Sequence, residues 1–345
     1  MMDFLSFIII CVKVLLVFAG TLLAVLIMVY AERRVSAFMQ GRLGPNRVGP
    51  QGLLQPIADG IKFLMKEDII PDGVNKPIYL LAPVIMLVPA LMTFAVIPFG
   101  STITLFDRDI ILQVADVNIG ILYILALTSI GVYGIVLAGW ASNSKYTLIG
   151  GLRSSAQLIS YELALGLSVV SIILMSGSLR LNDIVADQQG YLLSWYVFKQ
   201  PLAFLIFLIA TYAETNRLPF DLAEAEQELV GGYHTEYSSM KFAMFFMSEY
   251  ANMITAAALT VTLFFGGWDV PLLDEKSLGI WGAMLSVASF ILKLGFFLFL
   301  FIWIRWTFPR FRYDQLMKLG WKVLLPLSLI NIFITGGYLT LAALK

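Results

Sequence analysis

The chain has one cysteine and one histidine in 345 residues, and its acidic and basic side chains balance at 23 each. A single cysteine, Cys11, cannot form a disulfide framework or ligate an iron–sulfur cluster within this chain. A single histidine, His234, leaves no haem or zinc ligand set. A chain without net charge lacks the basic field typical of nucleic-acid-binding proteins. Any redox centre is therefore expected on a partner or on a diffusing molecule.

Apolar residues dominate what is present. The chain is 59% hydrophobic and 13% charged, with a mean hydropathy of +0.84, which is too apolar for a soluble domain. A helix needs roughly 20 apolar residues to cross a bilayer, so the sequence predicts an all-α polytopic membrane protein with about eight spans in one membrane domain, residues 1–345. The expected spans are 4–30, 78–99, 118–140, 155–176, 202–216, 242–268, 278–306 and 323–344. The fifth is the shortest, and Glu214 interrupts its end.

The distribution of basic residues orients these spans. Sixteen Lys and Arg fall in loops 31–77, 141–154, 217–241 and 305–322, whereas five fall in the opposite loops and ends. The positive-inside rule then places these four loops on the cytoplasmic or matrix face and both termini outside. The membrane is expected to be a bacterial plasma membrane or a mitochondrial inner membrane.

The first inner-face loop, 31–77, has two parts. Residues 31–50 are basic and rich in Gly and Pro, which predicts an ordered, turn-rich segment rather than a helix. Residues 52–67 are amphipathic, with Leu53, Leu54, Ile57, Ile61 and Leu64 on one helical face. Such a helix suits the membrane surface or a partner protein. The alternative is that the basic residues only anchor the topology.

Three acidic residues fall within the predicted spans. Glu162 and Glu249 each lie eight residues from an inner end, about 12 Å deep at about 1.5 Å per residue, and Glu214 lies at the inner end of its span. Facing lipid would cost each several kcal/mol, so they are expected to line one internal cavity and could exchange protons there. Lys293 lies deeper and could extend this chain toward the midplane. The alternative is that the acids only bridge helices.

The inner loop 217–241 adds further carboxylates, namely Asp221, Glu224, Glu226, Glu228 and Glu236. If residues 221–229 are helical, Asp221, Glu224 and Glu228 share a face and titrate as a coupled set. Gly231 and Gly232 predict a flexible joint, followed by two hydroxyl groups on Tyr233 and Tyr237. The alternative for such a charge run is a solvated face, and a proton role for the lone His234 is not favoured.

Two long motifs resemble a known family. They read ERRVSAFMQGRLGPNRVGPQGLLQPIADGIKFLMKED and ETNRLPFDLAEAEQELVGGYHTEY. They are similar to the quinone-site membrane subunit of proton-pumping NADH:quinone oxidoreductase, respiratory complex I, and the resemblance covers essentially the whole chain. It implies that quinone is the substrate and that flavin and iron–sulfur centres lie on other subunits. It also implies partners: peripheral-arm quinone-site and iron–sulfur subunits on the inner face, and small and antiporter-like subunits laterally in the bilayer.

The resemblance also assigns residues. Arg33, Arg34 and Asp59 would line the quinone tunnel, beside Phe220 and the loop that holds Arg217, Tyr233 and Tyr237. Glu214, Glu224, Glu226 and Glu228 would form an acidic funnel, which Glu162 and Glu249 would continue toward the antiporter-like subunits. Which of Arg33 and Arg34 faces the tunnel stays open, because adjacent helical residues point about 100° apart.

Two other classes of protein are weighed against this one. A secondary proton or cation transporter would also need buried acids, but it should show an internal repeat with paired broken helices, and the sequence has none. A purely structural scaffold would explain the apolar composition but not the acids within the spans. Purification in mild detergent discriminates: a transporter should run alone, whereas a complex I subunit should co-purify with many other proteins and bound iron.

Overall fold

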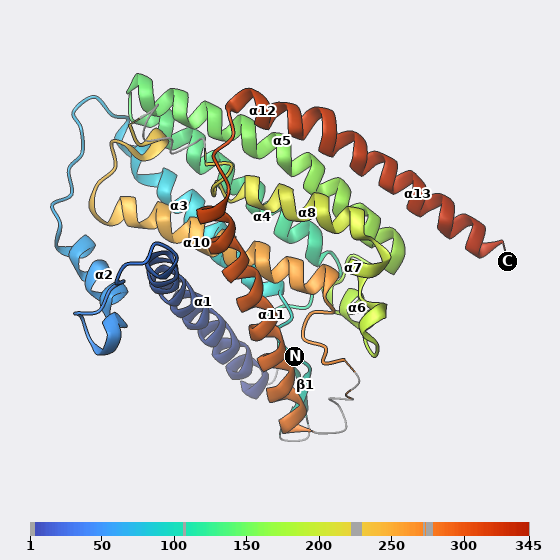
Figure 1. Ribbon diagram of the computed structural model, residues 1–345. Helices are drawn as coiled ribbons and strands as arrows, with labels where there is room; N and C mark the ends of the chain where they lie inside the picture. The colour runs from blue at the N-terminus through green and yellow to red at the C-terminus, as the bar shows by residue number, and fades with distance from the viewer. Residues whose placement is uncertain (1–3, 106–107, 222–229, 272, 274–278, 345) are drawn as a thin grey trace.

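A computed structural model describes residues 4–105, 108–221, 230–271, 273 and 279–344. Within them the fold is an all-α bundle, as predicted (Figure 1). Seven helical segments are long and apolar enough to cross a membrane. They are α1 (Phe4–Met39), α3 (Lys76–Met92, extended by a 3-10 turn Thr93–Val96), α4 (Gly120–Ala141), α5 (Lys145–Ser176), α10 (Ser239–Phe264), α11 (Ile280–Thr307), and the continuous run of α12 (Tyr313–Lys318), a π-helical turn (Leu319–Leu324) and α13 (Leu325–Ala343).

The predicted span 202–216 is a shorter helix, α8 (Pro201–Glu214), of 14 residues. At about 1.5 Å per residue it covers about 21 Å, less than the roughly 30 Å of a hydrocarbon core. Pro201 occupies its first turn, and Asn216 adopts a left-handed conformation just beyond its end. A helix that stops within the bundle leaves its terminal carboxylate, Glu214, inside the protein.

The remaining elements are short. They are α2 (Gln55–Met65), α6 (Leu181–Ala186), α7 (Tyr196–Lys199), 3-10 turns at Pro50–Gly52, Leu192–Ser194 and Gly232–His234, and a hairpin of β1 (Thr102–Leu105) and β2 (Arg108–Ile111). The strands pair antiparallel with Thr102 opposite Ile111. The amphipathic helix predicted at 52–67 is α2, which begins with Gln55-Pro56.

The prediction that residues 31–50 are turns rather than helix is wrong for the first half. Helix α1 continues to Met39 because no Gly or Pro occurs between Tyr30 and Gly41. Its buried side recurs at helical spacing through Val25, Met28, Glu32 and Ser36. The turn-rich segment therefore begins only after Met39, and Glu32 lies on the buried side of a helix.

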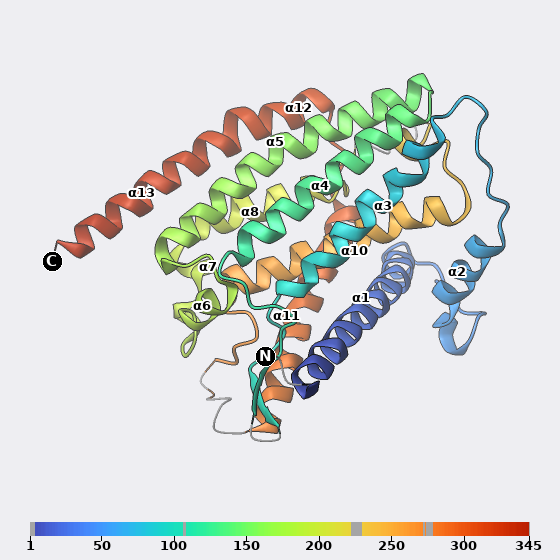
Figure 2. The same cartoon turned by 180° about the vertical axis from the view of Figure 1, so that it is seen from behind.

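Helix α10 is the centre of the bundle. It contacts α1, α3, α8 and α11, and 67% of its apolar stretch is buried, against 11% for α1 and 22% for α11 and for α12–α13. Small side chains such as Ala251, Ala256 and Ala257 let its neighbours approach closely. Helices α1 and α13 lie on the outside, and α13 leads away from the bundle to the C-terminus (Figures 1 and 2).

Candidate functional site

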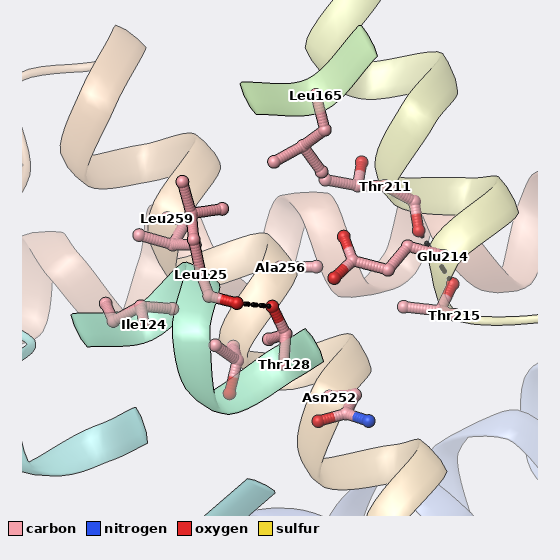
Figure 3. A pocket seen from close by; sticks show the side chains of 11 residues that line it. Ile124, Leu125, Thr128, Leu165, Thr211, Glu214, Thr215, Asn252, Ala256 and Leu259 are labelled. Carbon is pink, nitrogen blue, oxygen red and sulfur yellow. Dashed lines mark hydrogen bonds between the residues drawn. The ribbon is translucent and has the colours of Figure 1, made fainter. Parts of the chain in front are cut away.

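Two of the predicted carboxylates line one internal cavity. Glu214, at the end of α8, and Glu249, on α10, both border a cavity of about 20 Å³, with Asn252 one helical turn beyond Glu249. This volume is enough for the centre of a water molecule. A second cavity of about 20 Å³ also contains Glu214 and Asn252, and Figure 3 shows the Glu214 carboxylate pointing into it toward Thr128. Glu214 thus borders two small cavities that are lined mainly by apolar side chains.

The third carboxylate, Glu162 on α5, lies next to this pair. It accepts a hydrogen bond from the Ser129 hydroxyl of α4, and it is close enough to Glu214 for the two charges to interact. The Tyr233 hydroxyl donates to the Glu249 carboxylate over 2.9 Å. The prediction of one shared cavity is met by Glu214 and Glu249, whereas Glu162 lines neither of these two cavities and is held by Ser129 of α4.

The loop that carries Tyr233 packs tightly against α5 at Gly232. Gly232 has a φ of +66°, which favours glycine, and it is buried against α5. A Cβ on Gly150 of α5 would come within 2.8 Å of the Gly232 Cα. In this structure the two backbones meet at Gly232 with no room for a side chain, and the predicted flexibility of the Gly231–Gly232 joint stays a prediction. This contact holds Tyr233 over Glu249.

A residue that the sequence analysis missed holds the other end of the loop. The Gln157 amide, fully buried on α5, donates to the carbonyl oxygens of Ala213 at 2.8 Å and Phe220 at 2.9 Å. It thereby links the last turn of α8 to the chain beyond it. The sequence held a signal for this role. Gln157 lies within the predicted span 155–176, five residues before Glu162, and an amide within a span needs a hydrogen-bond partner inside the protein.

A second missed residue, Glu32, lies at the centre of a cluster of three charged side chains. Its carboxylate forms an ion pair with Arg305 of α11, lies 3.6 Å from the Arg217 guanidinium and accepts a 2.7 Å hydrogen bond from the Tyr250 hydroxyl. The Arg217 guanidinium also lies 4.4 Å from the centre of the Tyr250 ring. The sequence analysis did not single out Glu32 because the predicted span ended at Tyr30. The helical spacing of Val25 and Met28 places Glu32 on the same side of the helix, and this was the signal for its burial.

The structure resolves which arginine of the first motif pairs with Asp59. Arg33 of α1 lies 2.5 Å from the Asp59 carboxylate of α2. Arg34 instead donates to the Gln51 carbonyl at 2.7 Å, and the Tyr30 hydroxyl donates to the same oxygen at 2.9 Å. Arg33 therefore ties α2 to α1, whereas Arg34 holds the turn that precedes α2.

The remaining predicted tunnel residues are buried around the same loop. The Phe220 ring stacks on Phe311 with 5.4 Å between centroids, and Asp221 lies 3.1 Å from Arg310. Tyr237 stacks on Tyr79 at 4.1 Å, and the Tyr79 hydroxyl donates to the Glu236 carbonyl at 2.7 Å. Burial raises the pKa of the Tyr237 hydroxyl above its usual range, so this group stays protonated and donates to the Tyr79 carbonyl.

Some predicted coupling residues do not join the acids. Lys293 donates to the carbonyl oxygens of Phe265, Gly267 and Asp269 at 2.7–3.0 Å. Phe265 lies 16 residues beyond Glu249, about 24 Å along α10, so Lys293 holds the chain at the far end of that helix. Glu224, Glu226 and Glu228 lie outside the described residues.

The fold and the site together define an all-α polytopic membrane protein with carboxylates gathered in its interior. The sequence profile of one family, described as NADH dehydrogenase, matches residues 12–336. The chain is 58% identical over 335 residues to an NADH-quinone oxidoreductase subunit of Geobacter sulfurreducens, covering 94% of this chain and 93% of that protein. It is 54% identical to the corresponding protein of Koribacter versatilis, covering 96% of both chains, and 50% identical to that of Flavobacterium johnsoniae, covering 94% and 93%. The chain belongs to the NADH dehydrogenase family.

Proposed function

We propose that this chain is the membrane subunit of an NADH:quinone oxidoreductase that forms the quinone channel and part of the quinone site. It also couples quinone reduction to proton translocation through its buried carboxylates. The observation that carries the proposal is the shared cavity of Glu214 and Glu249, with Glu162 beside it. The names of the relatives support the reaction, since all three are subunits of NADH-quinone oxidoreductases.

The chemistry divides between this chain and its partners. Reducing a quinone to a quinol takes two electrons and two protons, and the electrons come from redox centres on the peripheral subunits. The part of this chain is to admit the quinone and to respond to its changing charge. Arg33 and Asp59 between α1 and α2, and Arg217, Phe220, Tyr233 and Tyr237 around the loop, form the channel wall. The residues assigned to the wall combine an ion pair with aromatic rings, which are residue types that suit a polar headgroup on an apolar tail.

The carboxylates form the coupling path. The cavity that Glu214 and Glu249 share has room for a water centre, so a water molecule there can carry a proton between them without a direct contact. Glu162, which accepts a hydrogen bond from Ser129, adds a third carboxylate to this path. Asp221 and Glu236 lie on the same loop as Tyr233, and the resemblance assigns Glu224, Glu226 and Glu228 to the same path.

The partners follow from the exposed surfaces. Helix α1 leaves most of its apolar side chains uncovered, as do α11 and α13, and these faces suit lipid and the small and antiporter-like membrane subunits. The peripheral-arm subunits cover the inner face. The relatives come from bacteria, which favours a bacterial plasma membrane, with both termini on the outer side.

The channel is tested at Asp59. Asp59→Asn removes the partner of Arg33 and should lower NADH:quinone activity by about three- to tenfold, because a mispositioned wall weakens quinone binding without touching electron input. NADH oxidation with an artificial acceptor that takes electrons from the soluble arm should stay normal. The control Asp72→Asn, at an exposed position, should leave both activities normal. Equal loss of both activities in Asp59→Asn would trace the defect to assembly instead.

The orientation is tested by cysteine labelling in sealed right-side-out vesicles after Cys11→Ser. Tyr191→Cys, at an exposed position before α7, should react with a membrane-impermeant maleimide from the outer side. Lys318→Cys, at an exposed position of α12, should react only after the membrane is permeabilised. The reverse pattern would invert the topology.

A further inference from the structure

Helix α2 is tied to α10 by contacts between residues 63–69 and residues 238–241. The Ser239 hydroxyl lies 2.9 Å from the carbonyl oxygens of both Phe63 and Lys66. These carbonyls belong to the last turn of α2 and to the residue that caps it, where the helix supplies no partner. A side chain 176 residues away in sequence thus completes the hydrogen bonding at the end of α2.

Two further contacts reinforce this connection. The Ile69 amide donates to the Ser238 hydroxyl at 2.9 Å. The Lys241 ammonium lies 2.8 Å from the Asp68 carboxylate and 5.1 Å from the centre of the Tyr79 ring. The Lys241 side chain is only 10% exposed, so its charge is committed to these two partners rather than to solvent. We call Ser238, Ser239, Lys241 and Asp68 the α2 clamp.

The backbone of Ser239 adopts a strained conformation in the clamp. Ser239 has a φ of +55°, in the left-handed region that non-glycine residues rarely adopt. Such conformations persist only where surrounding contacts hold them. In this structure the left-handed turn directs the hydroxyl toward the end of α2 at the point where α10 begins.

The middle of α2 is held separately. Arg33 of α1 binds Asp59 in the middle of α2, so α2 bridges α1 and α10. Its apolar side chains Ile57, Ile61 and Leu64 are half or more exposed, as expected of a helix that lies in the membrane surface. With few apolar side chains buried, the position of α2 depends on a small number of contacts. These are the Arg33–Asp59 pair, the α2 clamp, the turn that Arg34 holds and the contact of Phe63 with Phe242.

We infer that the residues of the α2 clamp are positioning residues that keep α2 in place beside the channel, so that a long-tailed quinone can pass from the bilayer. This inference rests on the proposed quinone function. If one attachment is lost, α2 occupies the required position for only a fraction of the time, and the apparent affinity falls by that fraction. A quinone with a short tail makes little contact with α2 and should be affected far less.

The test uses the assembled complex in proteoliposomes with two quinones, one with a long isoprenoid tail and one with a ten-carbon tail. Lys241→Met keeps the length of the side chain but removes its charge, and Asp68→Asn removes the opposite charge. Each should raise the KM for the long-tailed quinone by about three- to tenfold, with kcat and the short-tailed KM close to wild type. The double variant should be little worse than either single variant, and Lys241→Arg should restore most of the affinity.

A matched control is Lys318→Met, because Lys318 forms an exposed pair with Asp314 on the same side of the membrane and is 65% exposed. It should change neither KM. Equal rises in KM for both quinones, or no rise for either, would overturn the clamp. If Lys241→Met fails to assemble, Ser239→Ala deletes a single hydroxyl, and the same split between quinones must appear with it for the inference to survive.

The outcome at Asp59 separates this inference from the proposed function. If Asp59→Asn impairs quinone reduction while Lys241→Met and Ser239→Ala leave the long-tailed KM unchanged, the clamp is wrong and the channel stands. If Asp59→Asn also leaves quinone kinetics unchanged, the channel itself is wrong.

Discussion

Glu214→Gln is expected to lower both quinone reductase and proton-pumping activity by at least about tenfold, because groups that transfer protons commonly contribute about 10²–10⁴-fold to rate. Glutamine keeps the shape and much of the hydrogen bonding of glutamate but cannot carry the proton. Glu249→Gln should do the same, since both carboxylates line one cavity, and so should Glu162→Gln. The measurement is NADH-driven acidification of inverted membrane vesicles alongside quinone reduction.

The activity of double variants, compared with that of the single variants, tests this prediction more sharply. If the three acids act as one path, the Glu214→Gln and Glu249→Gln double variant should be little worse than either single variant. Glu→Asp changes should lose less than Glu→Gln changes. The matched control is Glu67→Gln, an exposed glutamate beyond α2. Fully assembled Gln variants that pump at normal rates would show that the acids only hold helices together.

Glu32→Gln is expected to have the second largest effect. It removes the acid between Arg217 and Arg305, and the Arg217 side chain is only 10% exposed. Breaking a buried ion pair by removing one partner costs about 3–5 kcal/mol, because the other charge stays desolvated. We therefore expect a lower thermal unfolding temperature of the purified complex and a loss of most quinone reductase activity.

A second substitution tests whether the loss of stability comes from the unpaired charge rather than from lost packing. Arg305→Met in the Glu32→Gln background should recover part of the lost thermal stability, because it relieves the unpaired positive charge. Tyr250→Phe, which deletes only one hydrogen bond to Glu32, should cost about 0.5–1.5 kcal/mol or somewhat more because the acceptor is charged. If Glu32→Gln were as stable as the unmodified protein, the ion pairs would not contribute to holding α1 against α11 and against Arg217.

Much of the architecture could be predicted because a bilayer imposes simple rules on a sequence. Seven of the eight predicted spans correspond to helices of sufficient length, since a run of apolar residues has few alternatives in lipid. The helical rise placed Glu162, Glu214 and Glu249 at similar depths, and in the structure Glu214 and Glu249 line one cavity. The end of α1 was misplaced because hydropathy drops at Glu32 and the two arginines after it, although the helical backbone continues to Met39.

The sequence by itself determined the class of protein, the approximate spans, the amphipathic helix and the depth of the three acids. These depend on composition and on distances along one helix, which are local properties. Only the tertiary structure decided that Arg33 rather than Arg34 binds Asp59, that Glu32 joins Arg217 and Arg305, that Lys293 holds the far end of α10, and that Ser239 completes α2. The partners of these side chains lie on other helices, and which helices meet, and at what rotation, depends on how all of their side chains pack together.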